Sequence, residues 1–242
     1  MSFRSLHERG NPLVLFNIWD AGSARAVADA GAVALATGSA SVAGSLGYPD
    51  GQAFPFAQLL NVVERIRAVS DLPLSVDFEA GYADDVASVA ANAARLEALG
   101  VAGINIEDGI PPGSGMRPSA EQAGFIAAIR ERTSLFINAR TDLFLQDDAD
   151  EHKALVAEAV ERGHAYAASG ADGFFVPGLT QPELIRTICD ESSLPVNIMK
   201  SPSAPSLAKL ASLGVARVSF GPFPWRDAMQ GLGDAYREQC GG

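Results

Sequence analysis

The segment "ALGVAGI" (residues 98–104) marks a joint between a helix and a strand, and the same joint recurs along the chain. Gly100 follows an Ala/Leu-rich helical stretch, where a helix commonly ends in a left-handed residue, and an apolar strand-like run comes next. Three further joints have this form: "DAGAVAL" (29–35), "ASGADGF" (168–174) and "SLGVARV" (212–218). A joint that repeats in this way indicates alternating β and α units, and therefore an α/β fold.

With these joints as reference points, we predict eight strands and eight helices. The strands are expected at 13–20, 32–38, 72–79, 103–108, 135–141, 173–178, 195–199 and 217–221. The helices are expected near 22–30, 55–69, 84–99, 119–131, 150–169, 181–190, 205–213 and 225–238. The strands are almost continuously apolar, as parallel strands covered by helices are. Eight such units favour a closed (β/α)₈ TIM barrel over an open doubly wound sheet, and no linker divides residues 1–242, so we expect a single domain.

Composition narrows the class of protein. Hydrophobic residues make up 48% of the chain, which suffices for a large core, and the formal net charge is −11. This charge argues against a nucleic-acid-binding protein and against a polybasic membrane-surface protein. Cys189 and Cys240 are far apart and have no ligand-like spacing, and the first residues, "MSFRSLHERGNP", contain no apolar segment. We therefore expect a cytoplasmic protein with reduced thiols.

Polar residues gather where the predicted strands end. Barrel enzymes carry their chemistry at the carboxyl ends of the strands, so this rim is the expected site. The rim residues are Trp19–Asp20, Thr37–Ser41, Asp77–Glu79, Glu107–Asp108, Arg140–Asp142 and Ser219.

The carboxylates of the third and fourth strands are candidate metal ligands. Asp77 and Glu79 are two residues apart, so on a continuous strand they point to the same side, and Glu107 ends the next strand. Mg²⁺ prefers oxygen ligands and keeps several waters, so one or two direct carboxylates suffice. No His or Cys lies near the rim, which argues against zinc. The alternative is that these carboxylates are solvated or cap the following helices.

Arg140 ends the apolar strand "LFINART" on the same rim. A rim arginine suits bidentate binding of a substrate carboxylate or phosphonate. It suits equally an ion pair with Glu107 or Asp142 that holds the mouth of the barrel together.

Two loops on the rim are candidate functional segments. "ATGSAS" (36–41) offers backbone N–H groups and hydroxyls to an oxyanion, although Gly/Ser loops are common. "GIPPGSGMRP" (109–118) is long for a connection between a strand and a helix, and it is either a lid or an ordinary long loop.

The ordered motifs resemble the isocitrate lyase/phosphoenolpyruvate mutase superfamily. The likeness runs from "NIWDAGSARAVADAGAVALATGSASVAGSLGYPDG" (17–51) through "SVDFEAGY", "VAGINIED", "INARTD" and "GADGFFVPG" to "LGVARVSFGP" (213–222). The resemblance implies a TIM barrel, a Mg²⁺ ion (or Mn²⁺ in its place), and a small α-oxyacid or α-ketoacid substrate. A C–C or P–C bond would be made or broken through an enolate that the metal stabilises. A homo-oligomer, a dimer or tetramer, is also implied; whether its last helix is exchanged between subunits is left open.

The resemblance also implies roles for individual residues. Asp77 matches the principal metal ligand, Glu79 and Glu107 match carboxylates that act mostly through water, and Asp50 would lie near the water shell of the metal. The implied substrate-binding residues are Ser39, Ala40, Ser41 and Arg140, and Asp20 on the rim is added to this set. Tyr82, Arg140 and Ser39 are the predicted catalytic residues, with Tyr82 as a proton or hydrogen-bond donor.

The segment 109–118 departs from the family pattern. The lyase branch carries a K-K-C-G-H motif there, and the mutase and phosphonopyruvate hydrolase branches carry a lysine and an asparagine, whereas this chain has no Cys, Lys, His or Asn in the segment. Pro177 stands near the position of a family histidine. These departures favour a reaction that needs no lid acid, such as decarboxylation of oxaloacetate. A phosphonomutase-like or phosphonopyruvate hydrolase-like enzyme and a non-catalytic barrel that binds a carboxylate remain alternatives, and Arg117 is a candidate substrate contact.

Overall fold

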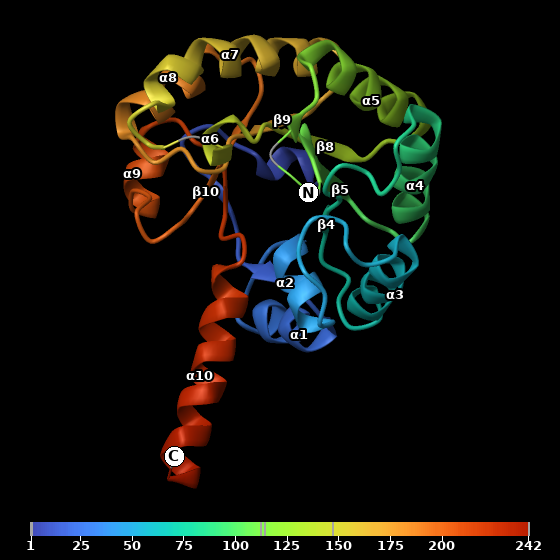
Figure 1. The fold of residues 1–242 in the computed structure, drawn as a ribbon, viewed down its shortest axis with the longest axis vertical. Coiled ribbons are helices and arrows are strands. Elements are labelled where there is room, and N and C mark those ends of the chain that lie inside the picture. The colour runs from blue at the N-terminus through green and yellow to red at the C-terminus, as the bar shows by residue number, and fades with distance from the viewer. Residues whose placement is uncertain (1, 112, 114, 147, 242) are drawn as a thin grey trace.

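The computed structural model describes residues 2–111, 113, 115–146 and 148–241. Parallel strands form a ring with the helices outside it (Figure 1). The first strand is interrupted at Phe16 into β1 (Leu13–Leu15) and β2 (Asn17–Ile18). β1 pairs with β11 (Arg217–Ser219) and β2 pairs with β3 (Leu35–Thr37), so the two parts of this strand close the barrel. The predicted (β/α)₈ barrel is confirmed.

The other strands follow in chain order around the ring. They are β4 (Leu74–Asp77), β5 (Gly103–Glu107), β8 (Phe136–Arg140), β9 (Gly173–Phe175) and β10 (Val196–Met199), all paired in parallel. The helices are α1 (Ala21–Asp29), α2 (Ser39–Ser45), α3 (Phe56–Arg67), α4 (Val86–Ala98), α5 (Ser119–Arg132), α6 (Leu143–Gln146), α7 (His152–Ala168), α8 (Pro182–Glu191), α9 (Leu207–Ser212) and α10 (Phe223–Cys240). The short helices α2 and α6 were not expected from the sequence.

The third strand of the barrel is shorter than predicted, and this changes the relation between two site residues. β4 ends at Asp77, and the chain then turns, with the Gly81 N–H donating to the Phe78 carbonyl at 3.0 Å. Glu79 lies in this turn with a φ of 50°. The premise that Asp77 and Glu79 share one face of a strand is therefore wrong, because the strand does not extend to Glu79.

The turn depends on Gly81. Its φ is +106°, and a Cβ there would lie 2.6 Å from Cγ1 of Val89. Only glycine fits this conformation and this approach to α4.

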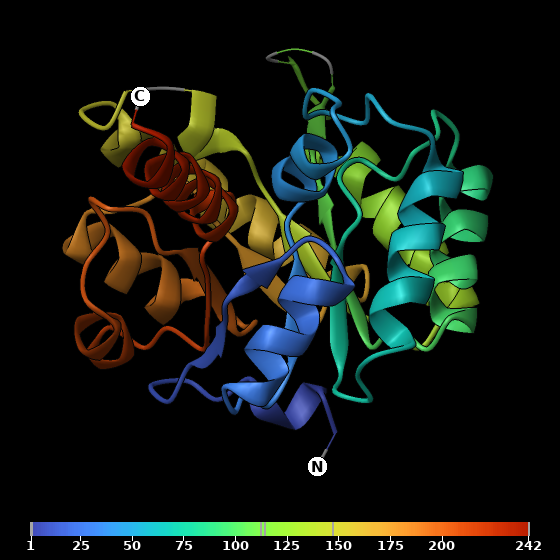
Figure 2. The same cartoon turned by 90° about the horizontal axis from the view of Figure 1, so that it is seen from below.

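The main hydrophobic core lies between the outer faces of the strands and the surrounding helices. A second cluster fills the amino-terminal end of the barrel, beneath the 3₁₀ helix η1 (Arg4–Leu6). There His7 stacks on Phe136 with 4.0 Å between ring centroids, and Phe3 packs edge-on against the same ring. Figure 2 shows η1 at the end of the barrel opposite the hairpin β6–β7 (Gly109–Ile110 and Gly115–Met116).

The interior of the barrel is more polar than the sequence indicated. We expected polar groups on one rim only, but buried polar side chains extend through the interior below it. They are Asn17, Thr37, Ser75, Asn105, Asn138, Asn197 and Arg217. Residues of one parity on a parallel strand all face inward, so polar residues at those positions can be recognised once the register is known.

The last helix leaves the ring of helices and projects away from it (Figure 1). Its first turn is fixed by Trp225, which packs so closely on α2 that a Cβ on Gly44 would lie 2.6 Å from the indole. No helix among the described residues is both long and apolar enough to cross a membrane.

Candidate active site

A cavity of about 200 Å³ opens at the carboxyl ends of the strands. One wall is polar and contains Asn17, Ser39, Asp50, Asp77, Asn105 and Arg140. The facing wall is mostly apolar and contains Leu145, Phe175, Pro177, Met199 and Pro222, with Arg226 at the mouth. The volume is smaller than a typical drug-sized pocket and suits a small organic acid.

Asp77 is the carboxylate that ends β4 and faces this cavity. Its Oδ2 accepts the Ser39 backbone N–H at 3.1 Å, and its Oδ1 accepts Nδ2 of Asn105 at a long 3.5 Å. The side chain is buried, and no Lys, Arg or His among the described residues forms a salt bridge with it. A buried carboxylate with neutral partners only is a natural position for an added cation.

Glu79, Tyr82 and Gln52 form a second group beside Asp77. The Tyr82 hydroxyl donates to Glu79 Oε1, the Gln52 N–H donates to Glu79 Oε2 at 2.7 Å, and the Tyr82 N–H donates to Gln52 Oε1. These three residues have φ values of 50°, 55° and 58°, and they are the non-glycine residues with positive φ in the described part of the chain. Left-handed backbone costs free energy in such residues, so its concentration here indicates a functional site.

The same contacts set the ionisation of this group. Burial raises the pKa of Glu79 to about 7; the Tyr82 hydrogen bond lowers it, while Asp77 and Asp50 raise it. Burial, and then the Glu79 charge, raise the pKa of Tyr82 far above its ordinary value, so the phenol keeps its proton. Burial, and then Asp77, also raise the pKa of Asp50. The electrostatic field here is strongly negative and disfavours further negative charge unless a cation is present.

Glu107 and Arg140 form an ion pair at the edge of the cavity. Arg140 Nη1 lies 2.9 Å from Glu107 Oε2, and Arg140 also donates from Nε to Asp142 Oδ1 at 2.6 Å and from Nη2 to Asp142 Oδ2 at 3.2 Å. Burial would lower the pKa of Arg140, but Glu107 and Asp142 raise it, so the guanidinium stays charged. Burial raises the pKa of Glu107, and Arg140 opposes this. The ion-pair interpretation of Arg140 is thus confirmed, and these contacts use three of its five N–H groups; the other two have no partner given among the described residues.

Behind this pair, a buried network holds the base of the hairpin β6–β7. Asp108 accepts the Tyr166 hydroxyl at 2.7 Å and Arg162 Nη1 at 3.1 Å. Arg117 donates to the carbonyls of Glu107 at 3.2 Å and Ala80 at 3.1 Å, and it stacks 4.3 Å from the centroid of the Phe125 ring. Arg117 is not among the residues that line the cavity, and its contacts anchor the hairpin. Residues 112 and 114 of the predicted lid lie outside the described residues.

The predicted substrate-binding residues are only partly brought together. Ser39 and Ala40, at the start of α2, line the cavity. Ser41 is fully buried beneath them, and its hydroxyl has no hydrogen-bond partner among the described groups. Asp20 does not reach the cavity: it is exposed and caps α1, where its Oδ1 accepts the Ser23 N–H at 2.7 Å. Tyr82 also stands outside the lining and packs among Phe54, Phe56 and Phe78.

The donor set fits a hard cation that keeps most of its waters. Among the described residues, no three acidic, His or Cys side chains lie close enough together to hold a metal by themselves. Glu79 is bound to Tyr82 and Gln52, and Glu107 is bound to Arg140. Asp77 and Asp50 are therefore the carboxylates of the cavity lining that have no salt bridge among the described residues, and Asp77 is the one that ends a strand. Mg²⁺ is commonly held by one or two carboxylates, with water on its other positions.

Several residues of the site were not identified from the sequence. Gln52 lies in an irregular loop, and its contact with Glu79 has no sequence signature. Asn17 accepts the N–H groups of Phe220 at 2.7 Å and Gly221 at 2.9 Å, and so ties the first strand to the last. Arg226 lies in the first turn of α10, after the connection from β11, and it falls inside a predicted helix, so no strand-end signal identified it.

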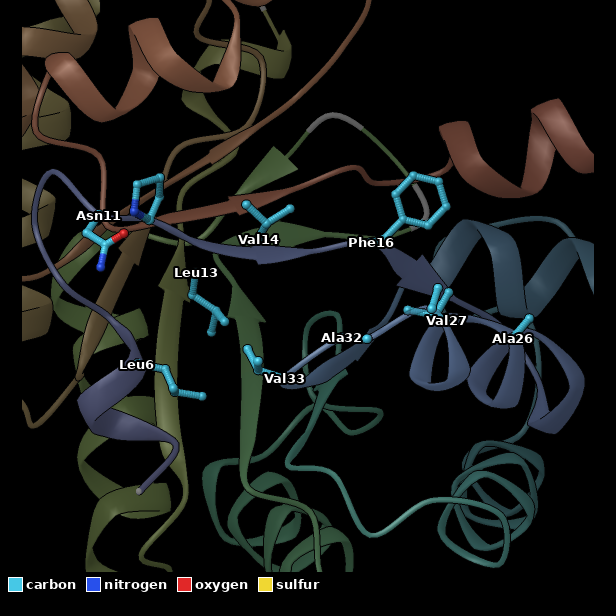
Figure 3. Close-up of a pocket in the computed structure, with 12 residues that line it drawn as sticks. Leu6, Asn11, Leu13, Val14, Phe16, Ala26, Val27, Ala32 and Val33 are labelled. Carbon is cyan, nitrogen blue, oxygen red and sulfur yellow. The ribbon is translucent and has the colours of Figure 1, made fainter.

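A larger groove, of about 680 Å³, lies on the outside of the barrel and is separate from the active-site cavity. It is lined by the outer face of the first strand, by α1 and by the segment before β3, and Val14, Phe16, Val27 and Val33 are among its side chains (Figure 3). Val33 is 58% exposed. The groove contains no acidic or basic residue, so it offers apolar surface and no chemistry.

Known proteins share this fold and much of this sequence. A protein of Burkholderia cenocepacia, provisionally named a phosphonomutase, has a crystal structure that superposes with a TM-score of 0.94, at 48% identity and with 97% of each chain covered. An uncharacterised protein of Mycobacterium tuberculosis is 35% identical over 98% of this chain and 88% of its own length. The oxaloacetate decarboxylase of Paraburkholderia xenovorans is 32% identical over 89% of this chain and 72% of its own length.

The likeness to an oxaloacetate decarboxylase supports an enzyme of the lyase kind. Residues 3–239 match the family described as phosphoenolpyruvate phosphomutase, and the chain therefore belongs to that family.

Proposed function

We propose that this protein is a Mg²⁺-dependent lyase that decarboxylates a small β-keto acid of the oxaloacetate type. The observation that carries the proposal is Asp77, a buried carboxylate with no cationic partner among the described residues, on the wall of a cavity of about 200 Å³. The 32% sequence identity to an oxaloacetate decarboxylase supports decarboxylation as the class of reaction. The metal is supported by the resemblance to a Mg²⁺-dependent superfamily and by the oxygen-only donor set.

In this proposal the residues of the polar wall bind and orient the substrate. Ser39 and the backbone of Ala40 meet one carboxylate, and the free N–H groups of Arg140 meet an oxygen of the same molecule. Asp77, assisted through water by Asp50, Glu79 and Glu107, would hold Mg²⁺, whose charge stabilises the oxygen at which negative charge develops.

The chemistry needs little else from the protein. Cleavage of the C3–C4 bond releases CO₂ and leaves its electron pair in an enolate, which takes up one proton at C3 to give pyruvate. The apolar wall of Leu145, Phe175 and Pro177 suits the uncharged CO₂, and Arg226 stands where a carboxylate enters. The described part of the hairpin places no acid or base over the cavity, which is consistent with proton delivery from solvent.

A phosphonomutase-like reaction is the second candidate, favoured by the 48% identical structure from Burkholderia cenocepacia. A barrel that binds a carboxylate without turnover is the third. We would measure pyruvate release from oxaloacetate and phosphonopyruvate, cleavage of 2-methylisocitrate, and conversion of phosphonopyruvate to phosphoenolpyruvate, each with and without Mg²⁺. The first proposal predicts Mg²⁺-dependent turnover of oxaloacetate above the reaction catalysed by free Mg²⁺. No turnover of any substrate, with Asp77-dependent binding of oxalate, would favour the non-catalytic barrel.

We also propose that the protein is a cytoplasmic homo-oligomer in which α10 packs against a second copy. Trp225, Met229, Leu232 and Tyr236 form one apolar stripe along α10, and Leu232 and Tyr236 are 66% and 67% exposed. The apolar groove of Figure 3 lies on the first strand, beside the start of this helix. A projecting apolar stripe and an open apolar groove on one chain complement each other when two copies meet.

A further inference from the structure

A buried arginine lies inside the barrel beneath the active-site cavity. Arg217 begins β11, and the strand register places it between Leu13 of β1 and Asn197 of β10. Only 1% of its surface is exposed. Its Nη2 donates to Ser75 Oγ at 3.2 Å and to Asn105 Oδ1 at 3.1 Å.

This guanidinium has neutral hydrogen-bond partners only, and Asp77 acts on its charge from beyond salt-bridge distance. No carboxylate among the described residues forms a salt bridge with it, and its Nε and Nη1 have no hydrogen-bond partner among the described protein groups. Burying a charge without a direct ion pair costs free energy, and an apolar side chain of similar size would cost the fold less. The contribution of Arg217 therefore lies in what its hydrogen bonds arrange, not in the stability of the core.

The hydrogen bonds lead from Arg217 to the active site. Asn105 Oδ1 accepts one hydrogen bond from Nη2 of Arg217 and a second from Nδ2 of Asn138 at 2.8 Å. With two donors on its oxygen, the amide of Asn105 must turn its Nδ2 toward Asp77 Oδ1, which lies 3.5 Å away. If the amide rotated by half a turn, its oxygen would face the carboxylate and repel it.

We infer that Arg217 is a positioning residue for Asp77 and acts through the amide of Asn105. The inference rests on the proposed function, in which Asp77 binds the metal. Groups that orient a metal ligand from behind commonly affect metal affinity as much as 10- to 100-fold.

The direction in which metal affinity changes when Arg217 is replaced distinguishes a positioning role from a purely electrostatic role and from a role in folding only. Arg217 is a cation near a cation site, so removal of its charge alone would make metal binding tighter. A role in folding only would leave the affinity of the folded protein unchanged. A positioning role predicts weaker binding, because Asn105 loses the donor that sets its orientation.

The test uses Mn²⁺ as the probe, with affinity measured by electron paramagnetic resonance on the full chain at fixed pH. We expect Asn105→Ala and Arg217→Met each to weaken Mn²⁺ binding by about 10- to 100-fold. Because both act on the same contact, the double variant should bind Mn²⁺ no more weakly than Asn105→Ala alone. Multiplied effects, an unchanged affinity or a tighter one in Arg217→Met would overturn the inference.

A second variant keeps the test decisive if Arg217→Met does not fold. Arg217→Lys retains the charge and one donor group, so its affinity should fall between that of the wild type and that of Asn105→Ala. In the Asn105→Ala background, Arg217→Lys should have no further effect; an added loss there would contradict the inference.

Mn²⁺ binding by Asp77→Asn tells whether the metal site itself is wrong or only the role given to Arg217. If the wild type binds Mn²⁺ no better than Asp77→Asn does, the metal site itself is refuted. If binding depends on Asp77 but is unaffected by any change at Arg217, only the inference is refuted.

Discussion

Tyr82 illustrates how a contact at the scale of one residue decides a chemical role. Its hydroxyl donates to Glu79 and its ring packs among phenylalanines, so it is directed to a carboxylate and not to the cavity. Of the two predicted roles, proton donor or hydrogen-bond donor, this contact favours the second, with Tyr82 orienting Glu79.

Tyr82→Phe tests this assignment. We expect the variant to need about 10-fold more Mg²⁺ for half-maximal activity, because Glu79 loses a hydrogen-bond donor. Its kcat at saturating Mg²⁺ should lie close to that of the wild type. If Tyr82 delivered a proton to the substrate, kcat would stay low at any concentration of Mg²⁺.

Some residue-scale features could be predicted from the sequence and others could not. Asp77, Glu107 and Arg140 were identifiable because each ends an apolar strand, and strand ends meet at one rim. The Gln52–Glu79 contact joins a loop to a turn in left-handed backbone, and no period or spacing encodes such an arrangement. Arg217 was missed because it begins its strand, in a segment whose neighbours are apolar.

At the scale of elements, η1 is the cap that closes the amino-terminal end of the barrel. His7, just after it, bonds to the Phe3 carbonyl through Nδ1 at 3.0 Å and stacks on Phe136. Burial, and then the charge of Arg217, lower the pKa of His7 to about 3. The cap is therefore built around a neutral imidazole.

This cap predicts a pH dependence of stability. The unfolded chain protonates His7 near its ordinary pKa of about 6.5, whereas the folded chain does so only near 3. The stabilisation that depends on a neutral His7 is thus fully present above pH 6.5 and is lost as the pH falls from 6.5 toward 3. Between pH 6.5 and 4.5 we expect this loss to amount to roughly 2–3 kcal/mol of unfolding free energy.

His7→Phe supplies the matched control, because it keeps an aromatic ring on Phe136 and removes the titration. Urea unfolding at both pH values should show a smaller loss of stability in this variant than in the wild type. Equal losses in the two proteins would contradict a neutral, buried His7.

The hairpin β6–β7 predicts an effect on stability without an effect on substrate affinity. Arg117 fastens its base to two backbone carbonyls and to the Phe125 ring, away from the cavity. Arg117→Met should lower the free energy of unfolding by roughly 2–4 kcal/mol, because buried carbonyls lose a charged donor. KM should change little; a large rise in KM with unchanged stability would restore Arg117 as a substrate contact.

The element pattern was largely predictable, because the repeated helix-to-strand joints and the apolar runs are local signals. The differences arise where tertiary contacts override them. β4 stops at Asp77 because the chain must turn to bring Glu79 to Tyr82 and Gln52. The short helix α2 forms in a Gly/Ser segment that reads as a loop, and the packing of Trp225 on Gly44 holds it.

At the scale of the whole molecule, we expect α10 to determine how copies of the chain meet. A stripe with Leu232 and Tyr236 exposed is unfavourable on an isolated chain. We expect light scattering coupled to size-exclusion chromatography to show a dimer or tetramer. The double variant Leu232→Asp/Tyr236→Asp should shift the measured oligomeric state toward the monomer.

Gln230→Asp, an exposed polar position on the same helix outside the stripe, is the matched control and should leave the assembly unchanged. A wild-type monomer, or equal assembly in all three proteins, would contradict the proposed role of α10.

In the proposed function, Asp77 holds a Mg²⁺ ion and the barrel acts on small keto acids. The most direct measurement is the rate of pyruvate formation from oxaloacetate at saturating Mg²⁺, for the wild type and Asp77→Asn, with the reaction of free Mg²⁺ subtracted. The proposed function predicts a wild-type rate above that background and a rate more than about 100-fold lower in the variant, since loss of even an outer group of a metal site commonly lowers affinity or activity by about 10- to 100-fold. Equal rates in the two proteins, or a wild-type rate no higher than that of free Mg²⁺, would contradict it.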